Sequence, residues 1–185
     1  MAKINAKEIF KDSILELMQK KSLNNISVFN IVDNSGLSRQ SFYVHYKDKY
    51  DLINQIFDAD IAQAVNLIKS DAVFMDVKIE AMLDSMHNNL RFYVKALEYT
   101  GQNSLIRHIR DTAYYNHSEN LMPKVQNEIP MQKITYCLNY HANCITIALV
   151  EWMKDGAVIP SHDIVSIVTE CMPHLMKTNY IFKNM

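Results

Sequence analysis

The stretch "SGLSRQSFYVHYKDKYDLI", residues 35–53, decides how this sequence is interpreted. It follows an apolar-patterned segment and contains Gly36, one of only three glycines in the chain. A glycine here predicts a helix break, because it supplies the positive φ that a tight turn requires. Ser38 then predicts an N-cap for a second short helix over about residues 39–45. The stretch therefore predicts two short helices joined by a tight turn.

The residues around this turn fall into an inward set and an outward set. Ser27 is expected to cap the helix that precedes the turn. The inward set is apolar and comes from both helices and their flanks: Val28, Ile31, Val32, Leu37, Phe42 and Tyr46. The outward set contains Arg39, Gln40, Ser41, Tyr43 and Val44. Two short helices joined in this way are typical of a helix-turn-helix, whose second helix enters the major groove of DNA.

The outward side chains have the chemistry that a DNA interface needs. Arg39 has two donors for a guanine edge, and Gln40 pairs with adenine through two hydrogen bonds. Phosphate contacts fix the register of a protein on DNA without reading its sequence. The candidate phosphate donors carry hydroxyl, imidazole or ammonium groups: Ser41, Tyr43, His45, Lys47 and Lys49. The alternative interpretation of the same residues is the solvated face of an ordinary helical bundle.

A resemblance favours the DNA-binding interpretation. Residues 5–57 resemble the DNA-binding domain of the TetR family of bacterial transcriptional regulators. The residues that carry the resemblance are Ser27, Gly36-Leu37-Ser38, Ser41-Phe42-Tyr43, His45-Tyr46 and Lys49. The resemblance implies that phosphates are contacted by Ser27, Ser41, Tyr43, His45 and Lys49, and bases by Arg39, Gln40 and Val44; Ser38 and Lys47 complete the predicted DNA-binding set. The chain departs from the family pattern at Val32, where alanine is usual, and at Ser41, where threonine is commoner.

The rest of the chain is expected to be helical, because few glycines and prolines interrupt it and no sustained strand pattern is present. Beyond the two short helices, the apolar spacing predicts helices over about 5–20, 48–69, 76–99, 104–121, 131–154 and 162–179. Pro173 should kink or end the last of these. The expected fold is all-α, with an N-terminal three-helix DNA-binding domain and a C-terminal helical bundle.

The domain organisation follows from this pattern. Residues 1–48 are expected to bind DNA, and residues 49–185 to bind an effector and to dimerise, with the helix 48–69 linking the two. Residues 1–50 hold eight Lys/Arg against five Asp/Glu, whereas the remainder is net acidic. A basic N-terminal part and an acidic C-terminal part suit a chain that meets a polyanion through one end only.

Two C-terminal helices are too apolar for one buried face each, which favours a four-helix bundle shared by two chains. The expected dimer residues lie on helices 131–154 and 162–179: Ile134, Leu138, Ile145, Ala148, Trp152, Ile164, Ile167, Val168, Cys171 and Leu175. Burial within one monomer is the alternative. The segments 93–109 and 147–156 are similar to DhaS-like members of the family, some of which act with a protein coactivator instead of sensing a metabolite.

The signal that the C-terminal part receives is expected to be a small molecule or a protein partner. Polar and aromatic residues of the middle helices are the candidate lining of an effector pocket: His87, Arg91, Tyr93, His108, Tyr114, His117 and His141. An amphipathic surface explains the same residues equally well. A ligand-responsive repressor acting on a palindromic operator is the first hypothesis, and an activator with a coactivator is the second.

Cys137, His141 and Cys144 share one helix face and suggest a zinc or redox site. The alternative is a packed core, because free cysteine is among the most buried residue types. An odd number of cysteines argues against a disulfide framework and for a reducing, cytoplasmic location. The sequence shows no cofactor or catalytic motif and no transmembrane stretch, so neither an enzyme, a cofactor nor a membrane partner is expected.

Overall fold

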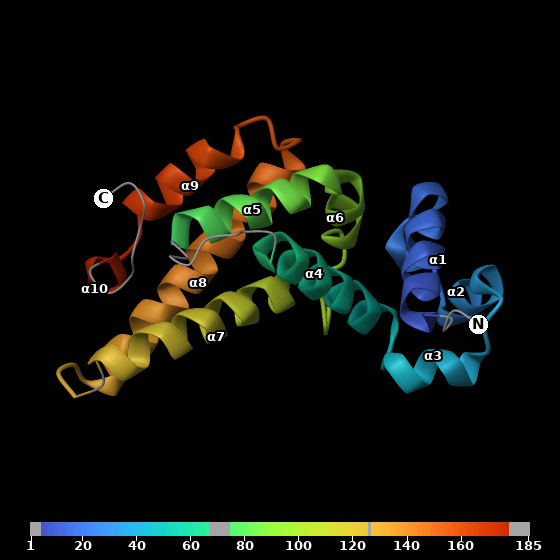
Figure 1. Ribbon diagram of the computed structural model, residues 1–185, viewed down its shortest axis with the longest axis horizontal. Helices are drawn as coiled ribbons and strands as arrows, with labels where there is room; N and C mark the ends of the chain where they lie inside the picture. The colour runs from blue at the N-terminus through green and yellow to red at the C-terminus, as the bar shows by residue number, and fades with distance from the viewer. Residues whose placement is uncertain (1–4, 67–74, 126, 178–185) are drawn as a thin grey trace. The chain divides into compact units, whose positions relative to one another are not determined.

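The computed structural model describes residues 5–66, 75–125 and 127–177, and these residues form helices joined by turns (Figure 1). The predicted all-α fold is confirmed. The helices are α1 (Ala6–Lys20), a 3₁₀ turn (Leu23–Asn25), α2 (Val28–Ser35), α3 (Arg39–His45), α4 (Lys49–Asn66), α5 (Met75–Asn88), α6 (Leu90–Ala96), α7 (Leu105–Val125), α8 (Met131–Lys154), α9 (Ser161–Glu170) and α10 (His174–Lys177).

The predicted helices 5–20, 39–45 and 131–154 agree with these bounds to within one residue, whereas the helix expected over 104–121 extends to Val125. The single helix expected over 76–99 is wrong, because the chain forms α5 and α6 with a break at Asn89. The break expected near Pro173 is confirmed, since α9 ends at Glu170 and α10 begins at His174. The ends expected at residues 69 and 179 lie outside the described residues.

The chain divides into two compact units. The head comprises residues 1–59 and 91–105, and the body comprises residues 60–90 and 106–185. The head therefore takes in α6 and the segment after it, which come from the middle of the sequence. Packing units and functional domains are different divisions of a chain, so the functional boundary at residue 48 stays a prediction.

Aromatic contacts hold α1 to α3 inside the head. The rings of Phe10 and Phe42 meet edge to face with centroids 5.3 Å apart, and Tyr46 lies 5.4 Å from Phe42. Ser13 on α1 donates its hydroxyl to the carbonyl of Ile31 on α2 at 2.8 Å. This hydrogen bond joins α1 to α2. Ile31, Phe42 and Tyr46 are buried, as the sequence predicts, and Val28, Val32 and Leu37 are half-buried.

The segment 91–105 is attached to the head by polar contacts. Lys95 donates to the backbone carbonyl of Met18 and to that of Gln19, at the end of α1. Asn103 donates to the Asp48 carboxylate at 3.3 Å and accepts from the Asn54 amide at 3.1 Å. Both ends of the segment therefore hold helices of the head.

An aromatic stack lies between these two polar contacts. Tyr99 stacks on Tyr50 of α4, with ring centroids 4.0 Å apart and an interplanar angle of 10°. Gly101 makes this possible, because a Cβ atom at residue 101 would lie 2.3 Å from the Tyr99 hydroxyl oxygen. Any other residue at position 101 would push the Tyr99 ring out of its place.

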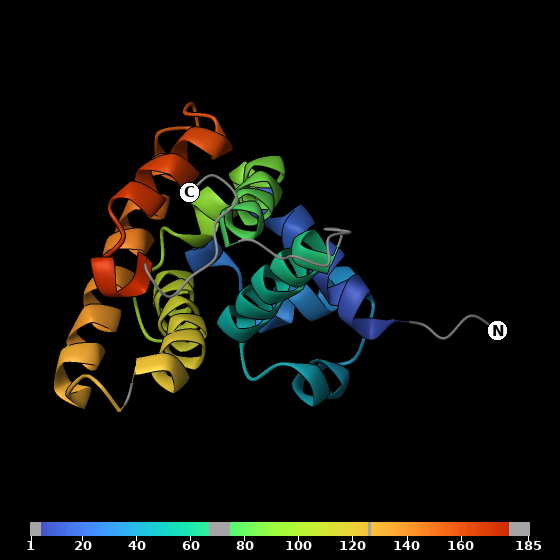
Figure 2. The same cartoon turned by 60° about the vertical axis from the view of Figure 1, so that its left-hand side comes forward.

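The body is built around the long helix α8. Helices α7 and α8 run side by side (Figures 1 and 2), and α5 packs against α9. One core cluster of the body consists of Leu121, Val125, Ile134, Leu138, Met172 and Met176. Trp152 donates its indole N–H to the carbonyl of Ile159 at 2.8 Å and so ties the end of α8 to the turn before α9.

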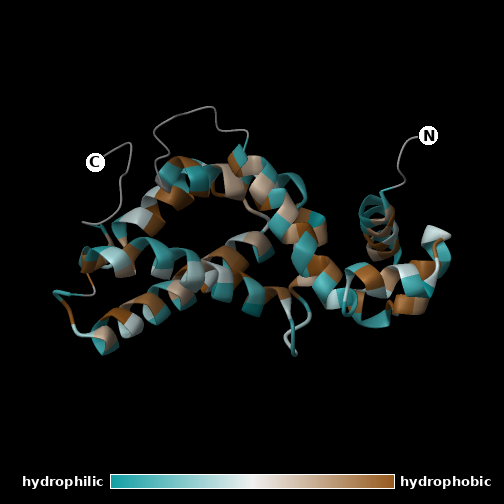
Figure 3. Ribbon diagram, turned by 60° about the horizontal axis from the view of Figure 1, so that its bottom comes forward, coloured by the Kyte–Doolittle hydropathy of each residue, from teal (hydrophilic) through white to brown (hydrophobic). Residues whose placement is uncertain are grey.

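The helices are amphipathic, and hydrophobic and hydrophilic residues are interspersed along their ribbons (Figure 3). Pro123 lies inside α7, in its last turn, beyond the end that the sequence predicts for this helix. Within the described residues no helix has both the length and the apolar composition required to cross a membrane.

Candidate nucleic-acid interface

Side-chain caps set the start of α2 and α3. The Ser27 hydroxyl accepts from the backbone N–H of Asn30 at 3.2 Å, and the Asn30 side chain accepts from the backbone N–H of Ser27 at 2.9 Å. This reciprocal pair is a capping box, which satisfies two backbone donors at once. Gly36 has a φ of 67° and ends α2 in the left-handed region, as the sequence predicts. The Ser38 hydroxyl then accepts from the N–H of Ser41 at 3.1 Å and starts α3.

Helix α3 exposes most of the side chains predicted to face DNA. Arg39, Gln40 and Val44 are exposed, whereas Phe42 between them is fully buried. Tyr43 is also exposed, and the Arg39 guanidinium donates to its hydroxyl at 3.3 Å and lies 5.5 Å from its ring centroid. The buried aromatic ring fixes the rotation of α3, so the same row of side chains always faces outward.

A shallow cleft of about 370 Å³ lies where the 3₁₀ turn ends and α2 and α4 begin. The Asp48 carboxylate caps α4 by accepting from the N–H groups of Tyr50 and Asp51 at 2.8 Å each. Ser27 lines the same cleft from the start of α2. Ser27 and Asp48 already cap these two helix starts and pair the N–H groups from which they accept, so a phosphate contact in this cleft stays a prediction.

Lys49 lies in this cleft, but its ammonium group points into the head. It donates to the carbonyl of Leu23 at 2.8 Å and to the carbonyl of Ile26 at 2.6 Å. Burial lowers the pKa of Lys49, against the opposing effect of the nearby Asp48 carboxylate. The described geometry thus gives this lysine a role in holding the 3₁₀ turn to α4, and its predicted phosphate contact stays a prediction.

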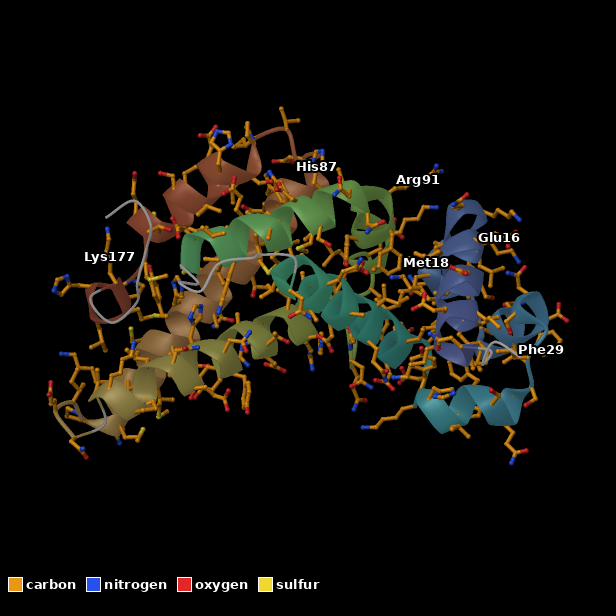
Figure 4. The ribbon with its side chains drawn as sticks, viewed as in Figure 1. Glu16, Met18, Phe29, His87, Arg91 and Lys177 are labelled. Atoms are coloured by element: carbon orange, nitrogen blue, oxygen red, sulfur yellow. The ribbon has the colours of Figure 1, made fainter. Side chains whose placement is uncertain are left out.

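The other predicted phosphate donors lie around the same surface. Ser27, Ser38 and Lys47 are exposed, and Ser41 and His45 are half-buried. Phe29 on α2 (Figure 4), absent from the predicted set, is 65% exposed next to the capping box. In the sequence, one apolar residue among polar neighbours looks the same whether its side chain is buried or exposed. The sequence therefore gives no sign that Phe29 is exposed.

The body presents an apolar face on α8 and α9. The predicted dimer residues divide between this face and the core. Those that are buried within the chain are Ile134, Leu138, Ile145, Trp152, Ile164 and Val168. Ala148, Ile167 and Cys171 are exposed, and Leu175 is half-buried. The predicted set omits a further exposed row of α8, although its helical spacing is visible in the sequence: Tyr136, Tyr140, Cys144 and Ile147.

Two buried histidines meet between α7 and α8. The imidazole rings of His117 and His141 have centroids 4.9 Å apart. Burial, and secondarily the charge of His141, lowers the pKa of His117 to about 4, and burial lowers the pKa of His141 as well. Both rings are therefore neutral at pH 7 and form part of the packed interior.

Comparison with known proteins identifies the family of this chain. A family model described as the C-terminal region of TetR-type transcriptional regulators matches residues 76–174, which is more than half of the chain. The chain belongs to the TetR family of transcriptional regulators. The shared region covers α5 to α9, so the family assignment rests on the body, while the helix-turn-helix of the head is the part expected to meet DNA.

Individual relatives of this TetR-family chain include activators and repressors. The dhaKLM operon transcriptional activator DhaS of Lactococcus lactis subsp. lactis (strain IL1403) is 28% identical over 92 residues, which are 50% of this chain and 49% of that protein. The chain thus spans about half the length of the curated relative it matches. A solved structure of the dihydroxyacetone kinase operon activator DhaS has the same fold, with a TM-score of 0.65, 18% identity and coverage of 96% of this chain and 99% of that one.

The TetR-family repressor AlkX from Dietzia sp. strain DQ12-45-1b has a TM-score of 0.52 at 14% identity, covering 96% of this chain and 98% of its own. The fatty acid degradation regulator FadR from Bacillus halodurans has a TM-score of 0.56 at 15% identity, covering 95% of this chain and 97% of its own. At these identities the structures show a shared fold and nothing about shared ligands.

The predicted effector residues of this TetR-family chain are divided between the two compact units. Arg91 and Tyr93 belong to the head, and Tyr93 is fully buried there against Phe57. The remaining members, His87, His108, Tyr114, His117 and His141, belong to the body. His87 (Figure 4) is exposed and lies 6.4 Å from Trp152, while His117 and His141 form the buried pair. The set as a single pocket therefore stays a prediction.

The sulfur residues also separate. Cys137 is half-buried against the body core cluster, whereas Cys144 and Cys171 are exposed. Among the described residues no group of three or more His, Cys, Asp or Glu side chains is placed to hold a metal ion. The packed-core interpretation suits Cys137 and His141 but is wrong for Cys144.

Proposed function

We propose that this regulator binds a palindromic operator as a homodimer, with α3 of each head in a major groove. The observation that carries the proposal is the exposed row of Arg39, Gln40 and Val44 on a helix whose rotation is fixed by Phe42. Arginine and glutamine are the side chains that recognise guanine and adenine edges through paired hydrogen bonds. Val44 offers an apolar contact for a thymine methyl group.

Phosphate contacts would hold α3 in register. Ser27 lies at the exposed start of α2 and lines the cleft where α2 and α4 begin, and its hydroxyl would turn from Asn30 to a phosphate. Tyr43 and Lys47 are exposed nearby and offer a phenol and an ammonium group. Contacts of this kind favour all DNA sequences alike, and they give the binding its dependence on salt.

The exposed apolar face of α8 and α9 supports the homodimer. Tyr136 is 82% exposed, Tyr140 63%, Ile147 56% and Ile167 51%, which places four large apolar side chains on one part of the body. Contiguous exposed apolar surface of this kind marks interaction sites in soluble proteins. A two-fold axis through this face would pair it with itself, as in most homodimers.

The signal would reach the heads through two connections in each chain. Helix α4 contains residues of both compact units, because the division falls at Ala59 inside it. The segment 91–105 is held to the head by the Tyr50–Tyr99 stack and by Asn103. Half-sites in an operator lie about 34–36 Å apart or at a multiple of this distance, so small displacements of each head prevent simultaneous binding.

The sign of regulation has two candidates. Repression by blocking transcription is the first hypothesis from the sequence, and AlkX is described as a repressor. Activation is the second candidate, and the 28% identity to the activator DhaS favours it. A reporter gene placed behind the selected operator distinguishes the two, because deletion of the regulator raises its expression in one case and lowers it in the other.

The test begins with selection of DNA fragments that the full chain retains, followed by titration of one such operator at several salt concentrations. Arg39→Ala is expected to relax base preference at one position in each half-site and to weaken binding by about 1–3 kcal/mol for each arginine–guanine pair that it removes. Arg107→Ala on α7 removes an exposed arginine of the body and serves as the control. An unchanged base preference in Arg39→Ala would contradict the proposed docking of α3.

A further inference from the structure

Two exposed side chains on the outer face of α3 contact each other four residues apart. The Arg39 guanidinium donates from Nη2 to the Tyr43 hydroxyl at 3.3 Å, and its Cζ atom lies 5.5 Å from the centroid of the Tyr43 ring. Residues at this spacing are neighbours on a helix surface. The contact matters because Arg39 is the side chain proposed to read a guanine edge, whereas the family resemblance implies only a phosphate contact for Tyr43.

The helix itself does not hold the Arg39 side chain. Arg39 is the first residue of α3, directly after the Ser38 cap. The first turn of a helix is the positive end of its dipole, which favours anions and not cations. An arginine side chain also has many conformers in water, and most of them point the guanidinium away from any one base. The position of this guanidinium is therefore set by another side chain, and Tyr43 is the one that contacts it.

The Tyr43 ring is in turn held by the core of the head. It meets the Phe42 ring edge to face, with centroids 5.5 Å apart and an interplanar angle of 88°. Phe42 is fully buried and meets Phe10 of α1 edge to face at 5.3 Å. Aromatic pairs in this arrangement attract each other beyond the effect of burying their surface. A continuous row of contacts therefore runs from the core of the head to the arginine at its surface.

The two contacts with Tyr43 are strong enough to bias the conformation of Arg39. A cation–π contact at an exposed site makes the contacting conformers about two- to fivefold more populated. The hydrogen bond from Nη2 adds to this preference and sets the direction in which the planar guanidinium faces. Arginine has five N–H donors, so one bond to Tyr43 leaves the two that a guanine edge requires. Arg39 can thus stay on Tyr43 while it reads a base.

The Tyr43 hydroxyl has a further hydrogen bond to give. Its oxygen accepts from Arg39, so its O–H group stays able to donate to a phosphate oxygen. The residue is 47% exposed, as a contact with DNA requires. One side chain can therefore link a phosphate contact to a base contact.

We propose that Tyr43 is a specificity-determining residue, whose hydroxyl and ring hold the Arg39 guanidinium in the conformation that reads guanine. This inference rests on the proposed docking of α3 in a major groove, and it adds a positioning role to the predicted phosphate contact of Tyr43. A phosphate contact strengthens binding to every DNA sequence alike. Positioning of Arg39 strengthens binding only where the guanine is present, because less side-chain freedom is lost on binding. The two roles therefore differ in the ratio of the affinities for two sequences.

The experiment measures this ratio for the full chain with two DNA duplexes. One is the selected operator, and the other has adenine instead of guanine, in one half-site, at the position that Arg39→Ala identifies. Adenine presents a donor where guanine presents its O6 acceptor, so the second duplex loses the paired arginine contact. Ordering one long side chain on binding costs a factor of about two to twelve in affinity. Tyr43→Leu, which removes ring and hydroxyl, should lower the ratio by about this factor, and Tyr43→Phe, which keeps the ring, by less.

Two control variants separate positioning from other effects. Lys47→Met removes an exposed ammonium group with a predicted phosphate contact, so it should weaken binding to both duplexes equally and leave their ratio unchanged. Tyr115→Phe on α7 removes the hydroxyl of another exposed tyrosine, which bonds to Glu119 four residues along its helix, and should change neither affinity. In an Arg39→Ala background, Tyr43→Leu should no longer change the ratio, because its effect passes through the arginine.

Urea titration checks that each variant is folded, and Tyr43→Phe keeps the edge-to-face contact with Phe42 if Tyr43→Leu is not. The inference is overturned, and the docking of α3 stands, if Arg39→Ala changes the base preference but both Tyr43 variants keep the wild-type ratio. It is also overturned if Tyr43→Leu lowers the ratio equally with and without Arg39. If Arg39→Ala leaves the base preference unchanged, the proposed docking itself is wrong and this inference fails with it.

Discussion

Replacement of Lys49 by methionine separates two roles that the same residue has been given. The structure shows the ammonium bonded to the carbonyls of Leu23 and Ile26, whereas the family resemblance implies a DNA phosphate contact. Methionine keeps most of the apolar stem and removes the charge. The first role predicts a less stable head, and the second predicts weaker binding to every DNA sequence.

The magnitude follows from the two hydrogen bonds. Hydrogen bonds to charged groups contribute about 1.5–3 kcal/mol each when buried. Lys49 is only partly buried, so water replaces part of each bond and we expect Lys49→Met to lower the free energy of unfolding by about 2 kcal/mol. For a chain of this size that corresponds to a fall in Tm of about 4–8 °C.

Circular dichroism during heating and urea titration measures the change in stability, and operator titration at several salt concentrations measures the DNA contact. Lys47→Met, at an exposed neighbour, is the control: its stability should stay within about 0.5 kcal/mol of wild type, while its salt slope should fall by about one. If Lys49→Met is as stable as wild type and shows the smaller salt slope instead, the structural role of Lys49 is refuted.

Three further changes have expected outcomes. Gly101→Ala should displace Tyr99 from Tyr50 and lower the free energy of unfolding by about 1–3 kcal/mol. In urea titrations this loss should disappear when the substitution is made in a Tyr99→Ala variant. An equal loss in wild type and in Tyr99→Ala would exclude the aromatic stack as its cause. The pKa of His117 in the folded protein, about 4, lies below its ordinary value of 6.5, so the contribution of neutral His117 to the free energy of unfolding is present above pH 6.5 and falls by about 3 kcal/mol between pH 6.5 and 4. Urea unfolding midpoints measured across this pH range test the fall. His117→Gln should make the free energy of unfolding less dependent on pH in this range. Ile147→Glu should leave unfolding nearly unchanged but weaken the dimer at least about tenfold in sedimentation, and an unchanged dimer would exclude this face as the interface.

Local chemistry is what the sequence conveys well here. Ser27, Gly36 and Ser38 each act through backbone groups no more than three residues away, and all three start or end a helix as predicted. Helical spacing also predicts that Phe42 and Tyr46 face inward, and both are buried. The family resemblance adds the roles of the outward residues, which spacing alone leaves undecided between DNA contacts and a solvated surface.

Contacts between distant segments are what the sequence conveys poorly. The break at Asn89 leaves the apolar period nearly intact, so the sequence predicts one helix where α5 and α6 stand. The carbonyls that hold Lys49 come from a turn more than twenty residues earlier, and no pattern announces them. The sequence also gives no sign that the effector set is divided between two compact units, with Tyr93 packed in the head and His117 packed against α8 in the body.

Trp152 is the only tryptophan in the chain, and it lies buried in the body at the end of α8. The Tyr50–Tyr99 pair, by contrast, belongs to the head. Indole fluorescence excited where tyrosine does not absorb therefore reports on the body alone. The protein thus contains an intrinsic optical probe, by which loosening of the α8–α9 turn can be followed in real time, without a label, while the heads remain on DNA.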